Sequence, residues 1–258
     1  MLSSIIKQKT AEIKLLKQTI NTLKPLPNKA QEISSHLRRA NGIGVIAELK
    51  RASPLKGELN SQLDLIKIAQ DYEQNGAIAI SVITDRTFFK GEPNFLPAVK
   101  SAVSLPILRK DFIIDEIQLY ETVNLGADLV LLIASILNYD KLLHLSELAL
   151  SLGLEPLVEI HTLSEARLIQ DLPITLVGVN NRNLNNFKVD ISNSLKLAPY
   201  LPQEVFKISE SGIKSPYDLK LLAQYDYNAA LIGESLVTSP SPGAKLRKLL
   251  NYSELQNG

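Results

Sequence analysis

From residue 44 onwards, short apolar runs alternate with longer segments in which apolar residues recur every three or four positions. The first pattern is typical of strands buried on both faces, and the second of amphipathic helices. The predicted strands are 44–49, 77–83, 107–108, 129–133, 156–160, 175–179, 206–208 and 229–232. The predicted helices are 62–75, 95–103, 115–124, 139–152, 163–169, 191–198, 216–223 and 243–250. Eight strand–helix units in about 200 residues favour a parallel (β/α)8 barrel over an open, doubly wound sheet.

The first 42 residues precede this alternation and predict a helical N-terminal extension, 1–42, of a single domain that covers 1–258. A helix is predicted over 3–24, because its apolar residues have helical spacing and Pro25 and Pro27 end the pattern. The lysines placed on its remaining surface are Lys7, Lys9, Lys14 and Lys17. Such a basic face suits a membrane surface or an acidic partner, but docking of the apolar stripe on the chain's own barrel is the favoured interpretation. A second helix is predicted over 30–39, followed by a turn at Asn41-Gly42.

The composition narrows the class of protein. With 45% hydrophobic and 21% charged residues, the chain is expected to be soluble and globular, and its net charge of +1 does not indicate nucleic-acid binding. The lack of cysteine excludes thiolate nucleophiles, disulfides and cysteine zinc sites, and the three histidines have no ligand spacing, so no metal is predicted. No apolar run approaches the roughly 18 residues that a membrane span requires. The expected protein is cytoplasmic, without a membrane partner, and is a monomer or a weak homo-oligomer.

The first predicted strand ends in charged residues. Glu48 and Lys50 are two positions apart, so in extended chain their side chains share one face. The next residues, Ala52-Ser53-Pro54, break the strand, and Gly57 frees the backbone for a loop. The stretch is either the rim of an active site or a surface salt bridge at a strand end, and such a salt bridge contributes little to stability.

Polar residues also stand where the other strands end, which is where (β/α)8 barrels carry their chemistry. They are Arg109-Lys110-Asp111, Glu159, Asn180-Asn181-Arg182-Asn183, Glu210-Ser211 and Glu234-Ser235, with apolar Leu131, Phe89 and Phe112 among them. Charged groups around an apolar wall are typical of a pocket for a small molecule with an aromatic part and charged ends. Each residue also has an ordinary interpretation when taken singly: a local ion pair of Lys110 with Asp111, a cap of the following helix by Glu159, and a plain polar loop for the asparagines.

A phosphate site is predicted between the last two strand ends. Gly212 follows the seventh strand and Gly233 follows the eighth, where backbone N–H groups face an anion. Glycine permits a close approach because it has no Cβ. Glu234 has the same sign of charge as phosphate, so only its backbone N–H is expected to help. The alternative is two ordinary glycine turns.

These motifs together resemble the indole-3-glycerol-phosphate synthase family of tryptophan biosynthesis. The matching text runs in order from residue 46 to residue 235: IAELKRASPLKG, LRKDF, LVEIH, GVNNRNL, SESGI and LIGES. The resemblance implies a carbon–carbon lyase, a decarboxylase that needs no cofactor. It closes the indole ring of 1-(2-carboxyphenylamino)-1-deoxyribulose 5-phosphate with loss of carbon dioxide and water.

The resemblance also implies roles for individual residues. Lys110 is expected to be the general acid of ring closure, Glu159 the base of dehydration and Lys50 a second acid. Glu48, Asn180 and Glu210 are expected to hold hydroxyls and orient the lysines. The phosphate is assigned to Ser53, Arg182, Ser211, Gly212, Gly233 and the Glu234 backbone, and the wall of the ring site to Pro54, Phe89, Phe112, Leu131 and Leu184.

Two alternative functions were also considered from the sequence. Phosphoribosyl-anthranilate isomerase is a related barrel with the same phosphate site, but it needs a cysteine or a comparable acid. A non-catalytic barrel that binds a phosphorylated ligand would be expected to lack charges at its strand ends, whereas Glu48, Lys50, Lys110 and Glu159 are present here.

Overall fold

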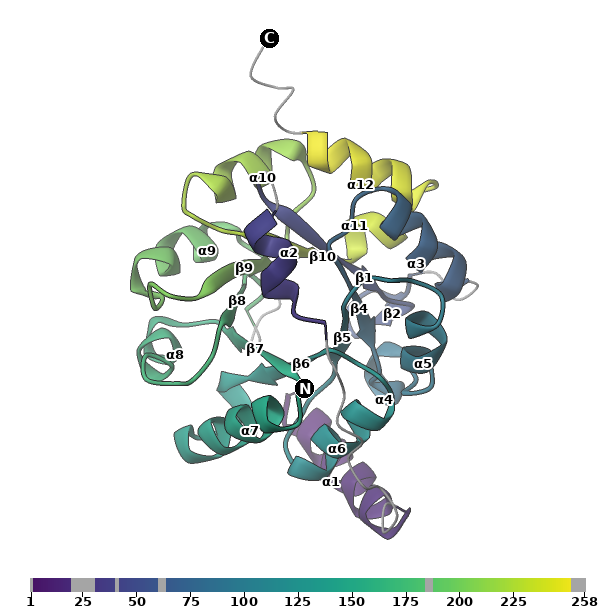
Figure 1. The fold of residues 1–258 in the computed structure, drawn as a ribbon, viewed down its shortest axis with the longest axis vertical. Coiled ribbons are helices and arrows are strands. Elements are labelled where there is room, and N and C mark those ends of the chain that lie inside the picture. The colour runs from purple at the N-terminus through teal and green to yellow at the C-terminus, as the bar shows by residue number, and fades with distance from the viewer. Residues whose placement is uncertain (1, 20–30, 40–41, 60–63, 184–187, 252–258) are drawn as a thin grey trace.

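The computed structural model describes residues 2–19, 31–39, 42–59, 64–183 and 188–251 (Figure 1). Eight parallel strands close into a barrel in the order β1-β10-β9-β8-β7-β6-β5-β4. They are β1 (Gly44–Leu49), β4 (Ala79–Ile83), β5 (Ile107–Lys110), β6 (Leu129–Ile133), β7 (Glu155–Ile160), β8 (Leu176–Asn180), β9 (Phe206–Glu210) and β10 (Ala229–Ile232). The predicted (β/α)8 barrel is therefore confirmed.

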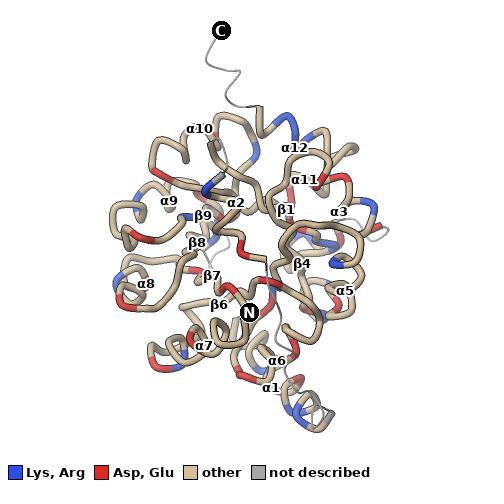
Figure 2. The backbone as a smooth tube through the Cα atoms, viewed as in Figure 1, with Lys and Arg blue, Asp and Glu red and all other residues tan. Residues whose placement is uncertain are grey.

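Helices surround the strands on the outside of the barrel (Figure 1). They are α3 (Leu65–Gln74), α4 (Arg86–Phe89), α5 (Phe95–Lys100), α6 (Glu116–Asn124), α7 (Tyr139–Ser151), α8 (Leu163–Leu168), α9 (Ser192–Leu197), α10 (Pro216–Ala223), α11 (Glu234–Val237) and α12 (Pro242–Leu250), with the 3-10 turns η1 (Ala134–Ile136) and η2 (Ala198–Tyr200). Several begin with a side-chain cap, such as Asp64 on α3 and Ser215 with Asp218 on α10, which satisfies backbone N–H groups at the helix start. Acidic and basic positions are interspersed around these helices (Figure 2).

Two separate apolar cores follow from the parallel sheet. The larger lies between the strands and the outer helices, and the smaller fills the barrel interior with residues such as Ile46, Leu108 and Leu157. Since strand side chains alternate between the two faces, both faces must be apolar, and this explains the near-continuous apolar strand runs of the sequence.

The N-terminal segment supplies two helices, α1 (Leu2–Thr19) and α2 (Ile33–Arg39). Ile33 and Leu37 of α2 join the core inside the barrel, and the Ile33 N–H donates to Glu155 Oε2 at 2.8 Å, so α2 packs against the start of β7 and lies across the ring of strands in Figure 1. The predicted helix 3–24 is seen over its described part; residues 20–24 and Asn41 lie outside the described residues.

The prediction for the lysine face of α1 was wrong at one position. Ile5 and Ile13 are buried, which confirms docking of the apolar stripe on the barrel, but Lys9 is buried as well, with only 2% of its surface exposed. Helical spacing alone placed Lys9 with the solvated lysines. Its ammonium group instead meets two buried carboxylates of the barrel, Asp85 and Asp111.

Candidate active site

A cavity of about 600 Å³ opens at the carboxyl ends of the strands. The predicted site residues that line it are Glu48, Lys50, Ser53, Pro54, Phe89, Lys110, Phe112, Leu131, Glu159, Asn180, Arg182, Glu210, Ser211, Gly212, Gly233 and Glu234. Leu184 lies outside the described residues. Residues from all eight barrel strands, or from the loops after them, therefore converge on one site, as parallel strands of a closed barrel require.

The Lys110 ammonium lies at the centre of the polar part of this cavity. Lys110 is the last residue of β5, and its Nζ is 3.1 Å from Glu159 Oε2 and 3.2 Å from Glu210 Oε2. Burial lowers the pKa of Lys110, but Glu159 and Glu210 outweigh it, so the net shift is upward. Lys110 is therefore a cation at neutral pH and is able to donate a proton.

The local ion pair considered for Lys110 with Asp111 is not formed. Asp111 instead accepts from Arg109 at 3.2 Å and from Thr84 at 2.6 Å. The helix after β7 is capped by Thr162, so Glu159 is not the cap. Both alternative interpretations of the strand ends are thus wrong for these two residues.

The two carboxylates beside Lys110 differ in their protonation. Burial raises the pKa of Glu159, but Lys110 and His161 oppose it and bring this pKa down to about 2. Burial and the neighbouring Glu159 charge raise the pKa of Glu210 to about 8, although Lys110 opposes them. Of the two, Glu159 therefore loses its proton more readily and is the better base, whereas Glu210 takes up a proton first, which lets two carboxyl groups share one small space.

Glycines make room for two of the acidic side chains. A Cβ on Gly178 of β8 would lie 2.2 Å from Glu210 Oε1, and a Cβ on Gly233 would lie 2.2 Å from Glu48 Oε1. Glu48 is almost fully buried and its Oε1 is 2.7 Å from Lys50 Nζ. The predicted Glu48–Lys50 pair on one face is confirmed, and it faces the cavity rather than the outer surface.

The opposite end of the cavity has the features expected of an anion site. Ser211 and Gly212 have positive φ angles of 67° and 87°, so the backbone turns sharply after β9. The Ser235 hydroxyl donates to the Ile213 carbonyl at 3.0 Å and ties this turn to the loop after β10. The short helix α11 begins at Glu234, directly after Gly233.

Cations gather at this end, and the sequence identified only part of them. Arg182, Lys56, Lys214 and Lys245 line the cavity, and Lys56 Nζ lies 2.6 Å from Glu234 Oε1. The Glu234 carboxylate is therefore held by cations, in addition to the backbone role that was predicted. Lys56 was missed because it sits in an exposed hairpin, β2 (Ala52–Ser53) and β3 (Gly57–Glu58), that apolar patterning does not reveal.

An apolar wall faces the charged groups. The Phe89 and Phe112 rings have centroids 6.2 Å apart and an interplanar angle of 37°. Leu131, Pro54 and two residues of α1, Leu2 and Ile5, complete this wall. The contribution of the N-terminal helix was not predicted, because its position on the barrel depends on tertiary contacts.

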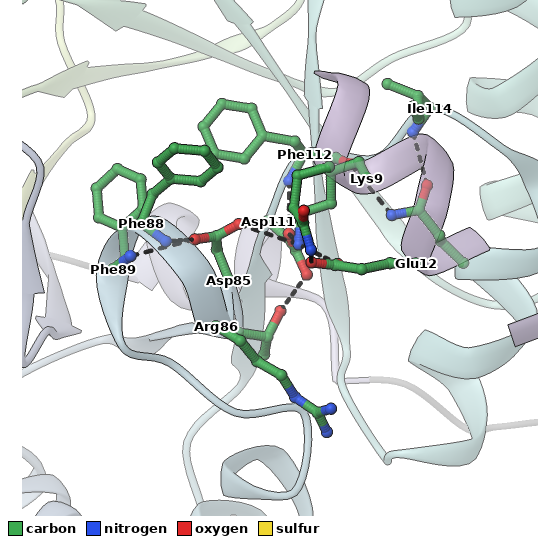
Figure 3. Close-up of polar contacts among 12 residues, drawn as sticks. Lys9, Glu12, Asp85, Arg86, Phe88, Phe89, Asp111, Phe112 and Ile114 are labelled. Carbon is green, nitrogen blue, oxygen red and sulfur yellow. Dashed lines mark hydrogen bonds and ion pairs between the residues drawn. The ribbon is translucent and has the colours of Figure 1, made fainter. Parts of the chain in front are cut away.

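Lys9 connects α1 to the two loops that carry the phenylalanines (Figure 3). Its Nζ lies 2.8 Å from Asp111 Oδ1 and 3.1 Å from Asp85 Oδ2. Asp85 caps α4 and accepts from the Phe89 N–H at 3.1 Å, while Asp111 accepts from the Phe112 N–H at 2.8 Å. One ammonium group thus fixes the helix and both halves of the aromatic wall.

Lys9→Met is expected to lower the free energy of unfolding by about 3 kcal/mol, because two buried carboxylates would lose their shared cation. The value is placed at the low end for a broken buried pair, since Arg109 still holds Asp111. Urea denaturation measures the change. Lys14→Met, on the exposed side of the same helix, is the control and is expected to change stability by less than about 0.5 kcal/mol. Equal losses in the two variants would contradict the role assigned to the Lys9 ion pairs.

Within the residues that the structure describes, no helix has the length and apolar character to cross a membrane. In the same part of the chain, no group of three or more histidine, aspartate or glutamate side chains is placed to hold a metal ion.

Comparison with known proteins gives one family. The model of the family described as indole-3-glycerol phosphate synthase matches residues 2–249. A protein of that name from Legionella pneumophila (strain Lens) is 42% identical over 253 residues, which cover 97% of this chain and 98% of that protein. Another, from Carboxydothermus hydrogenoformans, is 50% identical over 209 residues, which cover 81% of this chain and 79% of that protein.

Solved structures of other proteins share the fold. The 3-hexulose-6-phosphate synthase from Salmonella typhimurium has a TM-score of 0.67, with 14% identity, over 84% of this chain and 100% of that chain. The tryptophan synthase subunit alpha from Legionella pneumophila has a TM-score of 0.63, with 11% identity, over 88% of this chain and 99% of that chain. At these identities the likeness shows the barrel fold alone.

Proposed function

Because the chain belongs to the indole-3-glycerol phosphate synthase family, we propose that it closes 1-(2-carboxyphenylamino)-1-deoxyribulose 5-phosphate to indole-3-glycerol phosphate, with loss of carbon dioxide and water. The observation that carries the proposal is the Lys110 ammonium group in the cavity, 3.1 Å from the Glu159 carboxyl group and 3.2 Å from that of Glu210. The reaction needs an acid and a base side by side, and this arrangement supplies both.

Ring closure is assigned to Lys110. The anthranilate carbon that bears the carboxylate attacks the ribulose carbonyl carbon, and the carbonyl oxygen takes a proton from the ammonium group. The bond to the carboxylate then breaks, carbon dioxide leaves, and its electron pair restores the aromatic ring. A buried ammonium group aimed into the cavity stabilises the negative charge that develops on the carbonyl oxygen.

Dehydration is assigned to Glu159 with Lys50. The hydroxyl formed in the first step leaves as water after it takes a proton, and a neighbouring carbon loses a proton to form the last double bond of the indole. The low pKa of Glu159, which Lys110 and His161 maintain against burial, keeps this carboxylate ready to accept that proton. Lys50 lies on the other side of the cavity, and its partner Glu48 keeps it charged and oriented.

Asn180 and Glu210 are assigned to positioning. Asn180 is the last residue of β8, and its Oδ1 accepts from the Arg182 N–H at 2.9 Å, which fixes the side chain at the cavity. Glu210 is the last residue of β9, and its Oε2 lies 3.2 Å from Lys110 Nζ. The substrate hydroxyls are assigned to these groups and to Glu48.

The phosphate is assigned to Ser211, Gly212, Gly233, the Glu234 backbone, Arg182 and Ser53, and the anthranilate ring to the wall formed by Phe89, Phe112, Pro54, Leu131 and the position of Leu184. The two ends of the cavity match the two ends of the substrate: one is apolar and aromatic, and the other carries cations and a sharp backbone turn. Helix α11 begins at Glu234, at the same end of the cavity.

Arg182→Gln is expected to raise KM about 10-fold to 100-fold and to leave kcat nearly unchanged. A hydrogen bond to a charged group is worth about 1.5–3 kcal/mol, and the phosphate takes no part in the bond changes. Initial rates over a range of substrate concentrations measure KM and kcat separately. A fall in kcat at constant KM would contradict a purely phosphate-binding role. Arg167→Gln, on α8 outside the cavity, is the matched control.

The proposed activity is tested by incubating the protein with the carboxyphenylamino-deoxyribulose phosphate and following indole fluorescence. We expect product to form without added metal or cofactor. Phosphoribosyl anthranilate is offered in a parallel assay, because its conversion would favour the isomerase. Binding of the first substrate without any product would favour the non-catalytic barrel.

A further inference from the structure

The imidazole of His161 stands directly behind the proposed base. His161 follows β7 by one residue, and its Nε2 lies 3.3 Å from Glu159 Oε1. Lys110 contacts the other oxygen of the same carboxylate, Oε2, at 3.1 Å. The carboxylate of Glu159 is therefore held between two nitrogens, one on the cavity side and one behind it.

The second nitrogen of the ring faces another carboxylate. His161 Nδ1 lies 3.6 Å from Glu165 Oε2, and the same oxygen accepts from the His161 backbone N–H at 2.6 Å. Both ring nitrogens are shielded from solvent, and the His161 side chain is 7% exposed. A buried ring between two carboxylates carries a proton on each nitrogen more readily than a ring in water does.

His161 itself does not line the cavity, whereas Glu159 does. The ring therefore acts on the reaction through Glu159 and not through the substrate. The order Glu165, His161, Glu159 runs from a partly exposed helix residue to the wall of the cavity, and the ring meets both carboxylates at ion-pair distance.

We propose that His161 is a positioning residue that keeps the Glu159 carboxylate ionised and oriented for the dehydration step, with Glu165 holding the ring in place. The proposal deepens the proposed function, since it rests on Glu159 being the base. It gives a role to His161, the histidine of the segment LVEIH, although this residue does not line the cavity.

The carboxylates nearest the ring are Glu159 on β7 and Glu165 on α8, and each favours the imidazolium form. Glu210 on β9 adds to this effect only while it is ionised, and the Lys110 ammonium lies on the other oxygen of Glu159. Burial lowers the pKa of His161, but these carboxylates outweigh it and the net shift is upward. By reciprocity, the imidazolium favours the ionised form of Glu159 by the same free energy.

Loss of the imidazolium is expected to change the pH dependence of kcat. Without the imidazolium, the pKa of Glu159 rises, so the base is lost at a higher pH as the solution is made more acid. An opposite charge at this distance lowers the pKa of a carboxyl group by about one unit or more. Because the pKa of Glu159 is about 2 in the parent, His161→Gln is expected to move the acid limb of the kcat profile upward by about one pH unit, to about pH 3, and to leave kcat at pH 8 nearly unchanged.

His144→Gln is the matched control, because His144 is also paired with a glutamate, Glu116, at 3.4 Å, but on the exposed surface. Its kcat profile is expected to superimpose on that of the parent. An identical shape of profile for His161→Gln and the parent, with or without a lower rate at every pH, would overturn the proposal. Thermal denaturation confirms that each variant is folded.

A second measurement does not depend on activity. The chain has three histidines, so the ring signals in an NMR titration can be assigned by single substitutions. Glu159→Gln and Glu165→Gln are each expected to lower the pKa of the His161 ring, and Glu165→Gln retains an oxygen for the His161 backbone N–H. A His161 pKa that is unchanged in both variants would overturn the proposal, even if His161→Gln failed to fold.

The two measurements separate this proposal from the proposed function. If the parent made no indole product, the proposed function would fail while the titration still reported the coupling. If the parent made product, Glu159→Gln did not, and His161→Gln kept the parent profile, only the inference about His161 would fail.

Discussion

Lys110→Met is expected to lower kcat for indole formation by about 10²–10⁴-fold, the range that a positioned general acid contributes. The loss follows from the position of Nζ, which is the cation between Glu159 and Glu210 at the floor of the cavity. Methionine has nearly the same length and no proton to give. Single-turnover experiments are the measurement, with carbon dioxide release and indole fluorescence recorded together.

Lys50→Met is the informative comparison for Lys110, because it removes the second lysine of the same cavity. If Lys110 is the ring-closing acid, its loss prevents carbon dioxide release, since decarboxylation follows ring closure. Loss of Lys50 is expected to slow the later dehydration while carbon dioxide is still released. The reverse pattern would exchange the roles of the two lysines. Lys141→Met, exposed on α7, controls for a general effect of removing a lysine.

Glu159→Gln is expected to lower kcat for indole formation by about 10²–10⁴-fold while KM changes little. Glutamine keeps the size of the side chain and its contact with Lys110 but cannot accept the proton. Carbon dioxide is expected to appear in the first turnover without indole, because the ring closes and then fails to dehydrate. Rapid quenching and mass spectrometry of the bound species measure this directly.

Glu210→Gln is the control for Glu159. Burial and the Glu159 charge raise the pKa of Glu210, so this carboxyl holds a proton more readily than Glu159 does, and its replacement by an amide removes less negative charge. A smaller loss of kcat is therefore expected than in Glu159→Gln. Indole formation at the parent rate by Glu159→Gln would show that the base lies elsewhere.

The sequence predicted the barrel because parallel strands buried on both faces leave a clear pattern of apolar runs. Its strand ends were placed less well: the predicted strand 107–108 continues to Lys110, and the predicted strand 206–208 continues to Glu210. Both strands end in polar residues that point into the site, and an apolar criterion stops before them. The residues that carry the chemistry are thus the ones that break the local pattern.

Sequence patterns did not predict the contacts between segments that are far apart in the chain. Lys9 has the helical position of a solvated lysine, and only Asp85 and Asp111, brought together by the barrel, explain its burial. His161 was set aside because histidines far apart suggest no metal site, yet its neighbours are the carboxylates of Glu159 and Glu165. The assignments of Lys110, Glu159 and the phosphate residues came from a family resemblance, and their roles stay predictions.

The most direct test of the account is a crystal structure of Glu159→Gln with the carboxyphenylamino-deoxyribulose phosphate bound. We predict the phosphate at Ser211, Gly212 and Gly233, the anthranilate ring against Phe89 and Phe112, and the substrate carbonyl oxygen within about 3.2 Å of Lys110 Nζ. A substrate bound in the opposite direction, or with its carbonyl oxygen out of reach of Lys110, would contradict the assignment of this lysine as the acid that closes the ring.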